Sequence, residues 1–99
     1  MECNARYRII GRNAFEGFSS GRTVNMSGSG ILLVTESVLP PGFLIEIEID
    51  WPVRLADDVR LKMVVKGQIV RSENNDVARA GVKIFRYSFY TASRWRVDL

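Results

Sequence analysis

The sequence has 99 residues, of which 46% are hydrophobic and 25% charged, with 14 Lys and Arg against 11 Asp and Glu. A chain of this length forms one domain with a single core, and no run approaches the roughly 18 apolar residues of a membrane span. It contains no His and one Cys, which excludes zinc sites of the usual kind and His-based or Cys–His catalysis.

We therefore expect a single domain over residues 1–99 that is not an enzyme, needs no metal or cofactor and does not insert into a membrane. The first residues lack the long apolar region of a signal peptide, and the lone Cys3 cannot form an internal disulfide. Both features are compatible with a cytoplasmic location.

The amino-terminal part of the chain is predicted to hold three strands with polar connections. Alternating or β-branched runs indicate strands over residues 5–10, 22–26 and 30–36. A longer loop with two aromatic residues, Phe15 and Phe18, separates the first two strands. The first quarter of the chain is basic, and it carries Arg6, Arg8, Arg12 and Arg22. A phosphate-bearing ligand is one interpretation of this charge, and a solvated strand face is another.

The clearest strand is predicted over residues 43–51, after a tight turn formed by the Pro and Gly residues of 39–42. Its side chains alternate in character, so one face of the strand is expected to be buried and the other wet. The inward set is Phe43, Ile45, Ile47, Ile49 and Trp51, and the outward set is Leu44, Glu46, Glu48 and Asp50.

The same alternation predicts strands over residues 61–69 and 77–85, joined by a short hairpin-like loop at 73–76. Gly67 is expected at a bulge or bend and Gly81 at a kink, because glycine inside a strand weakens regular pairing. The inward residues of the first of these strands are Leu61, Met63, Val65 and Ile69.

The alternation breaks down in the tail. After about residue 86 we expect one short helix, with Tyr87, Phe89 or Tyr90, and Arg94 or Trp95 on one side. Six antiparallel strands with glycines at bends are typical of a small barrel. The predicted fold is therefore mainly all-β, a six-stranded antiparallel β-barrel with a short C-terminal helix packed on a face or mouth.

The connection between the second and third strands is more elaborate than a hairpin requires. Two residues such as Asn-Gly can close a hairpin. This turn instead uses Asn25, Ser27, Gly28, Ser29 and Gly30. Either it is a loose connection, or its backbone and short side chains are shaped to receive a ligand.

The chain resembles the PilZ domain family from about residue 5 to about residue 91. The turn "NMSGSG" fits the family motif Asx-x-Ser-x-x-Gly as Asn25, Ser27 and Gly30, and "GILLVT", "LPPGFLIEIEI", "VVKGQIVRSE" and "ARAGVKIFRYS" follow in order. The family comprises bacterial six-stranded β-barrels that bind the second messenger cyclic di-GMP. The resemblance thus implies a regulatory module for signal transduction that binds this nucleotide.

The resemblance also implies an arginine motif, Arg-x-x-x-Arg, which in the family lies just before the first strand and binds phosphate and guanine. Arg8 and Arg12 have this spacing, so the expected ligand-binding residues are Arg8, Arg12, Asn25, Ser27 and Gly30. The sequence begins too soon to hold an arginine loop ahead of its first strand, and the pair Arg6 and Arg8 is an alternative.

Two other functions are compatible with parts of the sequence. One is a degenerate PilZ-like protein-interaction module that no longer binds the nucleotide, with a contact surface at Phe15 and Phe18 or at Phe89, Tyr90 and Trp95. The other is single-stranded nucleic acid binding, which is favoured by the prediction of a small barrel that carries aromatic residues. The acidic row of the central strand and the net charge of +3 argue against it, so no DNA or RNA partner is expected.

Overall fold

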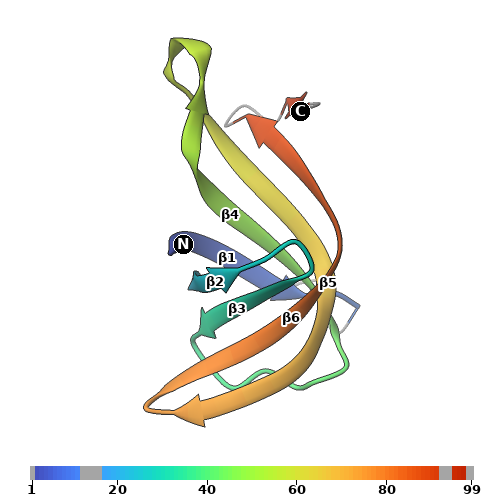
Figure 1. Cartoon of the computed structure of the whole chain (residues 1–99). Coiled ribbons are helices and arrows are strands. Elements are labelled where there is room, and N and C mark those ends of the chain that lie inside the picture. The colour runs from blue at the N-terminus through green and yellow to red at the C-terminus, as the bar shows by residue number, and fades with distance from the viewer. Residues whose placement is uncertain (1, 12–16, 92–94, 98–99) are drawn as a thin grey trace.

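The computed structural model describes residues 2–11, 17–91 and 95–97. Its elements follow in the order β1 (Cys3–Ile9), β2 (Ser19–Met26), β3 (Gly30–Thr35), β4 (Leu44–Leu55), the 3-10 turn η1 (Ala56–Asp58), β5 (Val59–Asn75), β6 (Val77–Thr91) and β7 (Arg96–Val97). At 17 and 15 residues, β5 and β6 are the longest strands, and with β4 they extend beyond β1 to β3 (Figure 1). No helix among the described residues has the length and apolar character needed to cross a bilayer.

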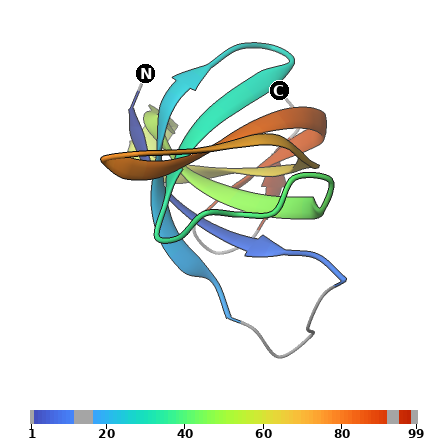
Figure 2. The ribbon, with the colours of Figure 1, turned by 90° about the horizontal axis from the view of Figure 1, so that it is seen from below.

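The strands form a closed barrel. Neighbours in the sheet order β3-β2-β1-β4-β5-β6 pair antiparallel, and β3 pairs with β6 to close the ring. Closure satisfies the backbone groups that an open sheet leaves unpaired at its two edges. Figure 2 looks at the barrel from below and shows the strands arranged around its interior. The predicted six-stranded antiparallel barrel is confirmed.

Alternating apolar side chains fill the barrel interior. Ile45, Ile47 and Ile49 of β4 are all 0% exposed, whereas Glu46 and Glu48 between them face outward. Burying each such isoleucine stabilises the fold by roughly 1.5–3 kcal/mol relative to leaving it exposed. The inward residues predicted on β5 are buried too: Leu61, Met63, Val65 and Ile69.

Two of the inward positions predicted on the central strand are less buried than the isoleucines. Phe43 precedes β4, directly after Gly42 with its φ of +95°, and is 40% exposed. The positive φ reverses the chain at this point, so Phe43 lies outside the regular alternation. Trp51 is partly buried and packs against the core.

Glycines mark the irregular points of the β5–β6 pair. A Cβ at Gly67 would lie 2.2 Å from the Lys83 carbonyl oxygen, and the strand register shifts beside this residue. The predicted bulge at Gly67 is therefore confirmed. A second register shift, between Ile69 and Arg71, lies opposite Gly81, so the irregularity predicted at Gly81 belongs to the facing strand.

The short helix predicted after about residue 86 is wrong for the described residues, because β6 continues as a strand to Thr91. The long strand β5 offers backbone partners over this whole length, and Tyr87 and Phe89 lie opposite buried residues of β5. Aromatic side chains at alternate positions suit a strand that has such a partner. β7 then pairs with the end of β6. Arg94 lies outside the described residues.

Candidate ligand-binding site

The β2–β3 turn holds the three motif residues at one end of the barrel. Asn25 is exposed near the end of β2, where a register shift makes the strand bulge. The Ser27 N–H donates a 2.9 Å hydrogen bond to the Gly30 carbonyl, and the Ile84 N–H donates another of 2.9 Å to the Ser29 carbonyl. The first bond closes the turn and the second fixes it against β6. Backbone hydrogen bonds therefore hold the turn in place.

An open cavity of about 260 Å³, called here the turn groove, lies beside this turn. Its lining residues are Asn25, Met26, Ser27, Gly30, Ile31, Leu32, Val70, Arg71, Gly81 and Val82. All three motif residues expected from the sequence thus line one groove. Among the described residues of this lining, Arg71 has the single charged side chain.

Strand register explains why residues so far apart in the sequence meet at the turn groove. Asn25 of β2 lies opposite Leu32 of β3, Leu32 lies opposite Gly81 of β6, and Gly81 lies opposite Arg71 of β5. The four residues form one row across neighbouring strands. Because adjacent strands are about 4.8 Å apart, Asn25 and Arg71 stand roughly 14 Å from each other at the two ends of the row.

Sequence reasoning missed Arg71, which extends over Gly81. A Cβ at Gly81 would lie 2.8 Å from Arg71 Cγ and 2.9 Å from Arg71 Nε, so the arginine occupies space that any other residue would fill. The Arg71 side chain is 64% exposed, and its Nε lies 3.5 Å from a Glu73 carboxylate oxygen. Arg71 could have been located from the sequence by pairing the two strands of the β5–β6 hairpin residue by residue. Pairing outward from the turn residue Asp76 brings Arg71 opposite Gly81.

Arg8 and Arg6 lie toward the other end of the barrel. Tyr7 pairs with the first residue of β2, whereas Asn25 lies near the end of that strand. At about 3.4 Å per residue, Arg8 is roughly 20 Å from Asn25 along the strands. The structure thus brings the three motif residues together without either arginine. Arg12 lies outside the described residues.

Arg6 and Arg8 both contact other side chains of the protein. Their guanidinium carbons lie 4.9 Å (Arg6) and 4.8 Å (Arg8) from the centre of the Phe18 ring. Arg6 also forms an ion pair with Glu48, and Arg8 Nη2 lies 3.2 Å from Glu46 Oε2. These contacts link Phe18, just before β2, through the two arginines to β4.

A second cavity, of about 400 Å³, lies on the outer face of β1, β4, β5 and β6. Its lining residues are Arg8, Glu46, Glu48, Lys62, Val64, Lys66, Tyr90 and Thr91. Two carboxylates lie among its three basic residues, and Glu46 lies 3.2 Å from Arg8 and 3.9 Å from Lys66, so the basic groups there already have acidic partners. The cavity is larger than the turn groove, but its mixed charge makes it a poorer host for a phosphate group.

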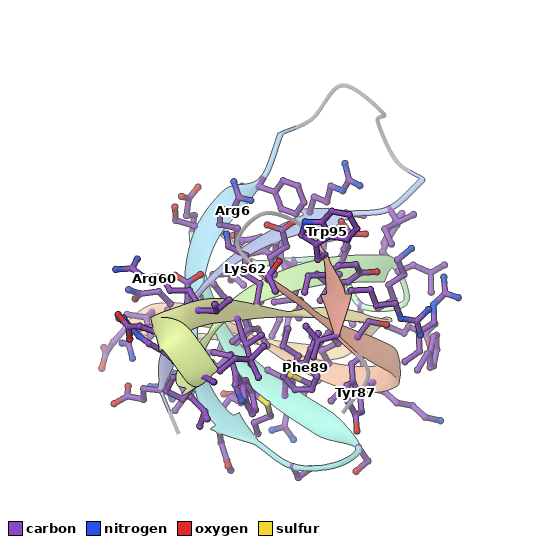
Figure 3. The ribbon with its side chains drawn as sticks, turned by 90° about the horizontal axis from the view of Figure 1, so that it is seen from above. Arg6, Arg60, Lys62, Tyr87, Phe89 and Trp95 are labelled. Carbon is purple, nitrogen blue, oxygen red and sulfur yellow. The ribbon has the colours of Figure 1, made fainter. Side chains whose placement is uncertain are left out.

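The aromatic side chains considered for a protein contact differ in exposure. Phe89 packs edge-on against Trp51, with ring centres 5.2 Å apart. Tyr90 is partly buried, and Trp95 is 74% exposed. Tyr87, which was not predicted for this contact, is 54% exposed. Figure 3 shows Tyr87 and Phe89 beside one another on β6, with Trp95 apart from them. Phe15 lies outside the described residues.

These features define the class of the protein, a small closed β-barrel domain with an open groove beside one hairpin turn. A model of the PilZ domain matches residues 2–91, and the chain belongs to this family. PilZ domains generally bind cyclic di-GMP, often bind proteins and are typically non-enzymatic receptors. A search of curated proteins and a search of solved structures found no match.

Proposed function

We propose that the chain is a non-enzymatic receptor that binds cyclic di-GMP at the turn groove and acts as a regulatory module in signal transduction. The observation that carries the proposal is the convergence of Asn25, Ser27 and Gly30 on one open groove. Family membership supports it, because PilZ domains generally bind this nucleotide.

Each motif residue offers a different contact to a cyclic dinucleotide. The exposed Asn25 amide both donates and accepts hydrogen bonds, as a guanine edge or a phosphate requires. The Ser27 hydroxyl lies 3.5 Å from the Gly30 carbonyl, a weak contact that a ligand can replace. Gly30 has no Cβ, so backbone groups of the turn can approach the ligand closely.

The amino end of β1 lies beside the strand that carries Asn25, which suggests how binding acts on the rest of the protein. The Cys3 N–H donates a 2.9 Å hydrogen bond to Thr23 Oγ1, and Arg22 Nη1 lies 2.6 Å from Glu2 Oε1. A ligand at Asn25 would therefore alter a surface next to the amino end. We expect the bound ligand to change which surface the amino end of β1 contacts. The size of this change is set by how much more tightly the ligand binds one conformation of that end than another.

Isothermal titration of the purified chain with cyclic di-GMP tests the proposal, with GTP and cyclic GMP as control ligands. We expect saturable binding of cyclic di-GMP and much weaker binding of both control nucleotides. No measurable heat and no shift of the thermal melt at high micromolar cyclic di-GMP would contradict the proposal.

Exposed aromatic residues favour a second candidate, a protein-interaction module that has lost the nucleotide. Beyond Lys83, β6 no longer pairs with β3, and Tyr87 in this part of the strand is 54% exposed. Trp95, which follows the strand, is 74% exposed. Aromatic residues are enriched at protein interfaces. The titration above separates the candidates, because this one predicts no nucleotide binding by the unmutated chain.

A further inference from the structure

We infer that Arg71 is the phosphate contact of the turn groove, a role that Arg8 does not fill from its position roughly 20 Å away along the strands. The inference rests on the proposed cyclic di-GMP binding and adds to it one residue of β5. Register, space and charge each support it independently.

Register places Arg71 where a ligand held by the β2–β3 turn would extend. It ends the row that begins at Asn25, and both side chains line the same groove. A cyclic dinucleotide carries two phosphates and two guanine rings, so it can contact polar groups at both ends of such a row. Leu32 and Gly81, which lie between them, leave the middle of the row free of charge.

Space on the β6 strand lets the arginine lie across the sheet. At Gly81, a Cβ would lie 2.8 Å from Arg71 Cγ, 3.3 Å from Cδ and 2.9 Å from Nε. All three contacts are with the flexible arginine and none with backbone. An alanine at this position would therefore displace the Arg71 side chain while the strand stays in place.

Charge in the turn groove favours an anion, because Arg71 is the single charged residue in the part of the lining that the structure describes. Its ion pair with Glu73 is long, at 3.5 Å, and exposed, and such pairs contribute little stability. The guanidinium can therefore turn its paired N–H groups toward a phosphate at small cost. Lys83, which is exposed and lies opposite Gly30, adds positive charge at the edge of the turn.

The test is a titration of the full chain with cyclic di-GMP, repeated on Arg71→Ala, Arg71→Lys, Gly81→Ala and the control Arg54→Ala. Arg54 suits the comparison because it is 44% exposed, lies outside the groove lining and is ion-paired with Asp58 at 2.8 Å. Its removal changes the net charge by the same amount. Thermal melts of the four variants check that each one is folded.

Arg71→Ala should bind at least roughly tenfold more weakly, and Arg71→Lys should lie between it and the unmutated chain, because lysine keeps the charge and loses the two-pronged hydrogen bond. Gly81→Ala should weaken binding although Arg71 is still present, and Arg54→Ala should stay within about twofold. The affinity of Arg71→Ala should also fall less steeply with added salt than that of the unmutated chain.

Affinity of Arg71→Ala within about twofold of the unmutated chain, or an equal loss in Arg54→Ala, overturns the inference and leaves the proposed function standing. Unchanged affinity in Gly81→Ala would overturn the claim that the space at Gly81 positions the Arg71 side chain. Absence of binding by the unmutated chain itself overturns both the inference and the proposed function.

Discussion

The guanidinium carbon of Arg8 lies 4.8 Å from the centre of the Phe18 ring, while its Nη2 lies 3.2 Å from Glu46 Oε2. These two contacts tie Arg8 to Phe18 and to β4. The turn groove lies roughly 20 Å from it along the strands. Spacing within the sequence made Arg8 a candidate ligand residue, and its part in binding stays a prediction that the Arg8→Ala variant tests.

Arg8→Ala should lower the free energy of unfolding by about 0.5–1.5 kcal/mol, because it removes an exposed cation–π contact and a partly exposed ion pair. It should leave the affinity for cyclic di-GMP within about twofold of the unmutated value. Chemical denaturation and titration measure the two quantities. A large loss of affinity with unchanged stability would instead assign Arg8 to the ligand site.

Asn25→Ala and Ser27→Ala should each weaken cyclic di-GMP binding by roughly 1–3 kcal/mol, because each removes a polar contact to a desolvated ligand. Neither should change the thermal melt appreciably, since Asn25 and Ser27 are exposed. Asn74→Ala, at an exposed amide near the β5–β6 turn, is the matched control and should bind normally. Equal losses in all three variants would argue against a site at the turn.

Gly67→Ala should destabilise the fold by about 2–4 kcal/mol, since the added methyl must displace backbone. Its Cβ would lie 2.2 Å from the Lys83 carbonyl oxygen and 3.0 Å from Val82 Cγ1. Gly28→Ala is the control, because nothing lies within 4 Å of its Cβ position. We expect it to cost less than about 0.5 kcal/mol. Similar urea midpoints for the two variants would contradict the close approach of β5 and β6.

Tyr7 should make the fold sensitive to alkaline pH. Burial raises the pKa of its hydroxyl above the ordinary value, the Glu36 carboxylate raises it further, and the hydrogen bond from the Glu36 N–H opposes the rise. A raised pKa means that the neutral form is favoured in the folded state. The contribution of the neutral Tyr7 hydroxyl to the free energy of unfolding is therefore complete below the unfolded pKa of about 10. It is lost as the pH rises through the pKa of the folded state.

Thermal melts from about pH 8 to about pH 11 check this, with Tyr7→Phe as the comparison. The phenylalanine variant should be less stable at the lower pH by about 1 kcal/mol, because the Glu36 N–H loses its acceptor. Its stability should then fall less steeply as the pH rises. Parallel curves for the two proteins would mean that Tyr7 does not carry the alkaline loss.

Local patterns were enough to predict the barrel interior and the motif turn. Each isoleucine of β4 alternates with an acidic residue, and a slip of one residue would bury Glu46 and Glu48, so the inward face is strongly specified. Asn25, Ser27 and Gly30 lie within one short turn, and their proximity needs no knowledge of the rest of the fold.

The structure of the tail and the positions of the arginines could not be predicted, because both depend on strand partners that are distant in the sequence. Residues 86–91 fit either a helix or a strand until β5 is known to pair with them. Arg71 reaches the turn groove through the register of β5 with β6, which sequence spacing does not reveal. Arg8 is close to Asn25 in the sequence and far from it in space, because β1 and β2 run in opposite directions.

The most direct test of the central claim is an NMR titration of the ¹⁵N-labelled chain with cyclic di-GMP, which maps the ligand onto backbone amides. We predict that the largest shifts cluster at Asn25–Gly30, Arg71 and Gly81, with small shifts at Arg8 and Phe18. Shifts concentrated at Arg8, Phe18 and Tyr90, or no shifts at high micromolar ligand, would contradict the account.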